Sequence, residues 1–130
     1  MIDKKLLAFI LSQSGDFHFC GGSLVGTEWV LTAAHCKVRP GVTVNIGDIN
    51  KDSDEMIERD VLEVFTHPGY GSNGMANDIA LLKIAPVEID NVKVSIACLP
   101  GTPSKAAGEN CFTGGWGALT EGGAGMVFIP

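Results

Sequence analysis

The chain has 130 residues, with nine basic and fifteen acidic side chains and a net charge of −6. Its length allows one domain and hardly two, because domains cluster at about 100–150 residues. The acidic balance excludes nucleic acid as an expected partner, since phosphate binding needs clustered Lys or Arg and the chain has no basic run.

The first apolar run, Leu6 to Leu11, follows Lys4 and Lys5 and so imitates a secretory signal. The run is shorter than the apolar core of about 7–15 residues that such signals have, and Ser12 to Gly15 is not a cleavage site of the A-x-A type. A buried strand is therefore the favoured interpretation. The same run falls far short of the roughly 20 residues of a membrane-spanning helix, so no membrane span is expected.

Short apolar runs continue along the chain, separated by Gly, Pro, Asn and Asp. This spacing predicts an all-β fold of the sandwich or barrel type. The expected strands are Leu6 to Leu11, Phe17 to Val25, Trp29 to Thr32, Val42 to Ile46, Val61 to Thr66, Ile79 to Ile84 and Cys111 to Gly115. Ile57 to Val64 alone fits a helical period, and it fits strand alternation equally well.

The composition changes after Pro100. Residues 101–108 are small and polar, and 114–125 are rich in glycine. We expect 1–100 to form one domain, and 101–130 to be a linker followed by the first strand region of a second, incomplete unit.

The four cysteines, Cys20, Cys36, Cys98 and Cys111, allow three full pairings. None lies in a C-x-x-C motif, so a structural zinc site lacks its usual spacing. Cys20 and Cys36 bracket two expected strands, and closing that loop would contribute roughly 3 kcal/mol to stability in the chain-entropy model. Such a bridge would indicate an oxidising compartment.

His35 directly follows an expected strand and precedes Cys36. A histidine anchored there suits a general base, whose position must be fixed before its pKa matters. An isolated histidine, however, is more often an ordinary core or surface residue.

Several segments together make the sequence resemble the trypsin-like (chymotrypsin family) serine endopeptidases, in order and spacing. The resemblance covers about residues 6–130, and its signatures are the T-A-A-H-C and D-I-A-L-L elements. The matching segments are Phe19 to Leu24, Trp29 to Cys36, His67 to Tyr70, Asn77 to Leu82, Cys98 to Pro100 and Gly114 to Gly117.

This resemblance implies the first six-stranded antiparallel Greek-key barrel of a two-barrel fold, with the second barrel largely missing. It implies His35 as the catalytic base, Asp78 as the carboxylate that orients it, and a Cys20–Cys36 disulfide. The family partners of Cys98 and Cys111 lie outside this chain, so these two should be unpaired or bonded to each other. A secreted enzyme acting on protein or peptide substrates is the implied whole.

The chain departs from the family in its nucleophile. The family carries its serine in a G-D-S-G-G-P segment of the second barrel, and here only Ser14 is followed by Gly, after Gln13 instead of Asp. The I-V-G-G-like mature N-terminus is also absent. We therefore expect this chain to be inactive alone. The alternatives are a non-catalytic single-barrel binding or decoy module, and one half of a split enzyme that a second chain completes.

No cofactor or metal is expected. Asp48 to Glu55 begins like an EF-hand loop, but position six is Ser53 and position twelve is Arg59. A calcium loop occurs at this place in some relatives, yet this loop looks shorter, which favours a solvated acidic turn. Gly69 to Gly74 matches G-x-G-x-x-G without the helix that a dinucleotide site needs, so a loop is expected there.

Overall fold

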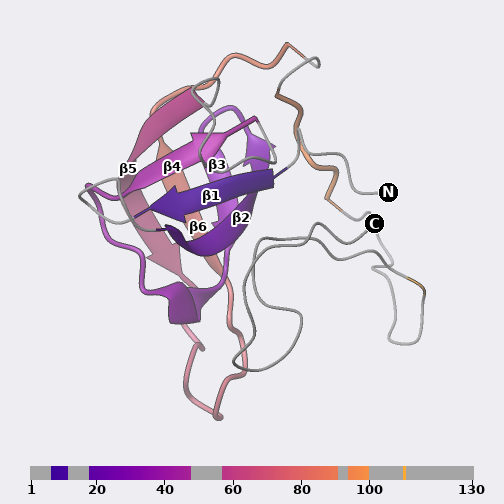
Figure 1. The fold of residues 1–130 in the computed structure, drawn as a ribbon. Helices are drawn as coiled ribbons and strands as arrows, with labels where there is room; N and C mark the ends of the chain where they lie inside the picture. Colours follow the sequence, from indigo (N-terminus) through magenta and orange to yellow (C-terminus); the bar gives the residue numbers. More distant parts are fainter. Residues whose placement is uncertain (1–6, 12–17, 48–56, 91–93, 100–109, 111–130) are drawn as a thin grey trace, which may run out of the picture.

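A computed structural model describes residues 7–11, 18–47, 57–90, 94–99 and 110 (Figure 1). The described segments contain antiparallel strands and one short 3-10 turn, which confirms the all-β prediction. The strands are β1 Leu7–Leu11, β2 His18–Gly26, β3 Trp29–Thr32, β4 Thr43–Ile46, β5 Ile57–Thr66 and β6 Ala80–Ile84; the 3-10 turn is η2 Ala34–Cys36.

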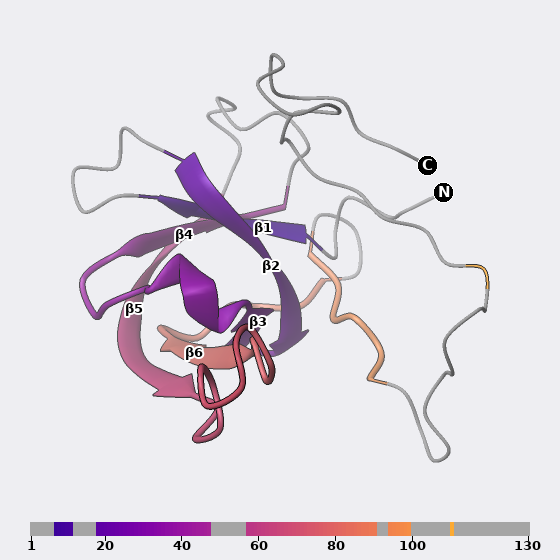
Figure 2. The same ribbon diagram turned by 90° about the horizontal axis from the view of Figure 1, so that it is seen from below.

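The strands form a closed barrel in the order β1-β2-β3-β6-β5-β4. Closure comes from β1, which pairs with β2 on one side and with β4 on the other, through Ala8↔Ile46 to Leu11↔Thr43. The spatial order β4-β1-β2-β3 is the Greek-key arrangement. Seen from below, the strands surround one interior, and both η2 and the loop between β5 and β6 lie at the same end of the barrel (Figure 2).

The barrel interior is filled by branched aliphatic side chains at alternate strand positions. Successive residues of a strand point to opposite faces of the sheet, so Val44 and Ile46, or Leu82 and Ile84, with one residue between them, face inward together. Residues with no exposed surface are Leu24, Val30, Val44, Ile46, Leu82, Ile84 and Val94.

Strand β5 begins earlier than the sequence predicts. The expected strand was Val61 to Thr66, but pairing with β4 extends it back to Ile57, from Thr43↔Asp60 to Ile46↔Ile57. The helical alternative for this segment is therefore wrong. The other described strands differ from their expected ranges by a residue at one or both ends.

Several expectations lie outside the described residues: the Cys111 to Gly115 strand, the acidic Asp48 to Glu55 turn, and the organisation of 101–130 apart from residue 110. Among the residues described, no helix has the length and apolar character needed to cross a membrane.

Candidate active site

His35 lies in η2, immediately after β3 ends at Thr32. The turn closes through the backbone N–H of Lys37, which donates to the carbonyl of Ala34 at 3.1 Å. Lys37 adopts a left-handed φ of 51°, which ends the turn after one repeat.

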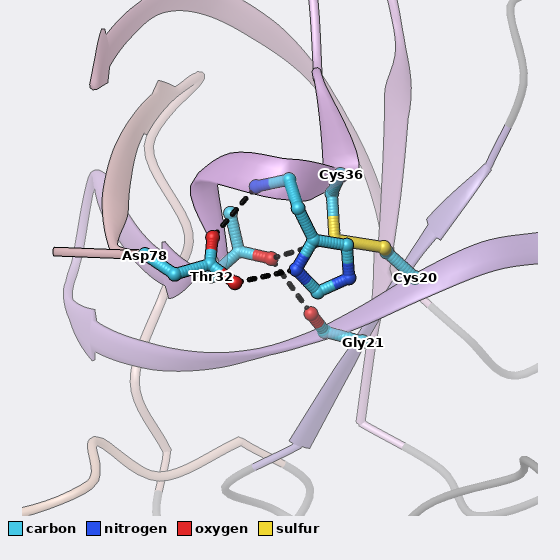
Figure 3. Close-up of a disulfide and its surroundings, with 6 residues drawn as sticks. Cys20, Gly21, Thr32, Cys36 and Asp78 are labelled. Atoms are coloured by element: carbon cyan, nitrogen blue, oxygen red, sulfur yellow. Dashed lines mark hydrogen bonds and ion pairs between the residues drawn. A yellow bond between two sulfur atoms is a disulfide. The ribbon is translucent and has the colours of Figure 1, made fainter. Parts of the chain in front are cut away.

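Two links fasten this turn to the neighbouring strand β2. The Cys20–Cys36 disulfide joins it covalently, with a Cα–Cα distance of 6.2 Å, so the pairing implied by the resemblance is present. The hydroxyl of buried Thr32 donates to the carbonyl of Gly21 at 2.8 Å (Figure 3). The backbone on both sides of His35 is therefore held in place.

Asp78 is positioned by a tight reversal just before β6. The N–H of Ile79 donates to the carbonyl of Asn77 at 2.8 Å, which makes Asp78 the central residue of a three-residue turn. Asn77 has a left-handed φ of 60°, a conformation that Asn tolerates better than most residues. Its side-chain amide donates to the carbonyl of Gly69 at 3.2 Å, which ties the reversal to the start of the loop.

The two residues meet although 43 positions separate them in the sequence. The ring Nδ1 of His35 lies 2.6 Å from Oδ2 of Asp78, and the backbone N–H of His35 donates to Oδ1 at 2.7 Å. The carboxylate thus contacts both the ring and the main chain of one residue (Figure 3). The His35 side chain is 53% exposed and that of Asp78 only 23%, so the histidine faces the solvent and the carboxylate lies behind it.

The hydrogen bond from the His35 side chain is the main reason why the pKa of Asp78 lies below its usual value. Partial burial acts in the opposite direction and raises the pKa, because it disfavours the charged form. The backbone N–H of His35, the charge of its ring and the backbone of Ala34 lower it further. Asp78 is therefore an ionised hydrogen-bond acceptor at neutral pH.

This arrangement fixes the tautomer of the imidazole. With its proton on Nδ1 donated to the carboxylate, His35 keeps a lone pair on Nε2, and an exposed nitrogen of that kind can accept a proton from another molecule. An ionised carboxylate behind the ring also stabilises the imidazolium that forms when the proton arrives.

The ligand atoms of Cys20, Cys36 and one ring nitrogen of His35 all lie within 4.8 Å of one another, the spacing of a possible metal site. The two sulfurs are joined in the disulfide, so neither is a thiolate ligand in this state. Cys98 is an exposed free thiol, in line with the expectation for it. Cys111 and the Asp48 to Glu55 loop lie outside the described part of the chain.

An apolar groove beside this site was not predicted from the sequence. Leu31, Leu81 and Phe65 lie opposite one another on β3, β6 and β5, on the outer face of the barrel. They line a groove of about 310 Å³ together with Thr66, His67, Pro68, Ile79 and Ala80. Phe65 is 48% exposed and also packs against Trp29, with ring centroids 5.7 Å apart.

A histidine whose Nδ1 is held by a carboxylate is the base half of a Ser-His-Asp system, which is recognised by geometry more than by sequence position. Here the pair lies at one end of a closed Greek-key barrel. The chain belongs to the trypsin family, whose family model matches residues 3–127.

Known trypsins are similar over nearly the whole chain. Cationic trypsin-3 of Rattus norvegicus is 35% identical over 122 residues, which are 92% of this chain and 49% of the rat protein. Trypsin-3 of Salmo salar is 39% identical over 119 residues, 90% of this chain and 49% of the salmon protein. The chain thus spans about half the length of these relatives.

A solved structure shows the same arrangement in space. Neuropsin, a serine protease expressed in the limbic system of mouse brain, superimposes with a TM-score of 0.77 and 32% sequence identity. The match covers 91% of this chain and 52% of the neuropsin chain.

Proposed function

We propose that this chain is the base-bearing part of a secreted, trypsin-like serine endopeptidase that hydrolyses peptide bonds by acyl transfer. The observation that carries the proposal is the 2.6 Å contact between Nδ1 of His35 and Oδ2 of Asp78 in a chain of the trypsin family. The Cys20–Cys36 disulfide supports secretion, because such bonds persist in oxidising compartments.

In this reaction His35 acts as general base and then as general acid. Its Nε2 takes the proton from the attacking serine hydroxyl, and later delivers it to the amine that leaves the scissile bond. Asp78 holds the ring orientation throughout and stabilises the imidazolium between the two transfers.

The nucleophile, the oxyanion hole and the specificity pocket are supplied from outside this chain. The sequence has no G-D-S-G-G-P segment, and the chain spans about half of its trypsin relatives. In this proposal 1–100 form the first barrel, and 101–130 lead into a second barrel that carries the serine. Alone, the chain is inert.

The apolar groove supports association with that second part. Its outer row, Leu31, Leu81 and Phe65, offers apolar surface that is costly to leave in water. We propose that the rest of the protein covers this row when the enzyme is whole.

The test is turnover of chromogenic arginine, lysine and aromatic peptide amides. We would assay the oxidised 130-residue chain beside an extended chain that includes a serine-bearing second barrel. The proposal expects no activity from the short chain, activity from the extended chain, and loss of that activity in the extended His35→Ala variant. The matched His67→Ala variant, with its change in the loop that precedes Asp78, should stay active.

Two results would overturn the proposal. Activity of the short chain that His35→Ala abolishes would show that one of its own residues is the nucleophile. A folded extended chain that cleaves none of the amides but binds peptide would support the alternative, a non-catalytic binding module.

A further inference from the structure

The disulfide beside His35 conceals a set of metal ligands. Cys20 Sγ, Cys36 Sγ and a ring nitrogen of His35 lie within 4.8 Å of one another. Tetrahedral zinc with Zn–S bonds of about 2.3 Å holds two sulfurs about 3.8 Å apart, which is within that span. The Cα atoms of the cysteines are 6.2 Å apart, so both side chains can reach one ion without moving the strands.

Oxidation state decides whether these ligands exist. A phosphine reductant cleaves the S–S bond by taking up an oxygen from water: the phosphine becomes its oxide, and each sulfur gains one electron and one proton. Both thiols release that proton when they bind a metal, because the thiolate is the ligand. Reduction thus converts one disulfide into two soft anionic ligands.

The surroundings of the disulfide hold the third ligand ready. Asp78 binds the Nδ1 side of the His35 ring at 2.6 Å, which leaves the Nε2 lone pair for a metal. Metal-binding histidines commonly donate their other ring N–H to a carboxylate in this way, which fixes the tautomer and raises the basicity of the ligand.

The cluster also has supports that do not depend on the disulfide. Thr32 keeps its 2.8 Å hydrogen bond to Gly21, and its hydroxyl lies 3.9 Å from the sulfur of Cys36. The η2 turn retains its own backbone hydrogen bonds, from Cys36 to Ala33 and from Lys37 to Ala34. The three ligands therefore stay close together after reduction.

We propose that the reduced protein binds one zinc ion through Cys20, Cys36 and Nε2 of His35, with the fourth position open to water. Two thiolates and one imidazole are a donor set that zinc favours, and three protein ligands with an open position are a known zinc arrangement. If the proposed function holds, this zinc would occupy the nitrogen that acts as general base, so metal binding and catalysis would exclude each other.

Cobalt(II) is the spectroscopic probe for this site, followed by displacement with zinc. We would use the full chain with Cys98→Ser and Cys111→Ser, so that only the Cys20–Cys36 pair supplies thiolates. The expected result, after phosphine reduction, is one cobalt per chain with thiolate charge-transfer and tetrahedral ligand-field bands that zinc abolishes. The oxidised chain should show none of these bands.

Variants in the same background separate a built site from a simple thiol pair. We expect His35→Ala to weaken cobalt binding at least tenfold, and Asp78→Asn to weaken it about 10–100-fold, the usual effect of losing a partner of a metal-binding histidine. His67→Ala should bind like the parent, because its ring lies outside the cluster. Circular dichroism follows whether the reduced chain keeps its β-sheet signal.

Three outcomes would overturn the proposal. One is the absence of thiolate bands in the reduced chain, and another is equal cobalt affinity in the parent and in His35→Ala. The third is loss of the β-sheet signal on reduction that zinc does not restore, since the ligands would then not share a folded site.

Discussion

Asp78 makes both of its described hydrogen bonds to one residue. One carboxylate oxygen contacts the ring of His35, and the other accepts from the backbone N–H of that residue. Replacing the imidazole therefore removes one of these bonds and leaves the other. This division makes the contribution of the ring measurable.

Titration of Asp78 by carboxyl ¹³C NMR should give a midpoint below that of an aspartate in the unfolded chain, because hydrogen bonding from His35 lowers its pKa. In His35→Ala the midpoint should move upward, toward the ordinary value. The ionised carboxylate stabilises the fold above the unfolded-state pKa, and this contribution is lost as the pH falls through the lower folded-state pKa. Equal midpoints in the parent and in His35→Ala would contradict this cause.

At the scale of residues, the sequence motifs pointed to His35 and Asp78, and the structure brings them together. The bonds that position them could not be predicted locally. The turn centred on Asp78 depends on a left-handed Asn77 and on its amide reaching Gly69, eight residues earlier. Nothing in the letters near Asp78 shows that contact.

Strand β2 depends on a glycine where it passes β3. A Cβ added at Gly22 would lie 2.8 Å from Cγ1 of Val30 and 2.9 Å from the backbone oxygen of Leu31, closer than real Cβ atoms approach. We expect Gly22→Ala to lower the free energy of unfolding by about 1–3 kcal/mol, the usual cost of overpacking. Urea unfolding of the oxidised chain measures this.

Gly26→Ala on the same strand is the matched control. Its nearest neighbour would be the movable Trp29 side chain at 3.3 Å, so its loss of stability should be smaller. Equal losses in the two variants would show that the close approach at Gly22 is not the cause.

Strand β6 provides a test of the barrel core. Leu82 has no exposed surface, whereas Leu62 on β5 is 50% exposed. We expect Leu82→Ala to cost about 2–5 kcal/mol of unfolding free energy, because it leaves a cavity, and Leu62→Ala to cost clearly less. A loss for Leu62→Ala that matches that of Leu82→Ala in urea melts would argue against this assignment of the core.

At the scale of elements, the sequence predicted strand identity better than strand ends. Glu58, Arg59 and Asp60 interrupt the apolar pattern, and for this reason the strand was expected to start at Val61. Their pairing with β4 shows that charged residues continue the strand where it faces solvent. Propensity alone does not carry that information, because the partner strand supplies the hydrogen bonds.

The outer groove should govern association of the whole molecule. Phe65 is 48% exposed and lies beside Leu81 in the apolar row. In sedimentation velocity at rising concentration, we expect Phe65→Asp to reduce self-association of the short chain several-fold, because a charge replaces its largest apolar surface. Met75→Asp, at a 62% exposed position outside the groove, is the control and should associate like the parent.

At the scale of the molecule, strand spacing was enough to predict an all-β fold. Alternation also implies that one face of β5 and β6 points outward, but the sequence does not show that Leu31, Leu81 and Phe65 align there. That row arises from register across three strands, two of which are far apart in the chain. Register over such distances is set by the complete barrel.

The closed ring also orders events in time. During synthesis, β1 and β2 can pair early, yet the second edge of β1 waits for β4, and β3 gains its second neighbour only when β6 arrives. Pairings of this long range are slow steps in folding, because the intervening chain must be ordered first. A nascent chain that has not yet inserted β6 between β3 and β5 carries a histidine with no carboxylate beside it. The acid–base pair is thus a late product of folding, and it forms as the ring closes.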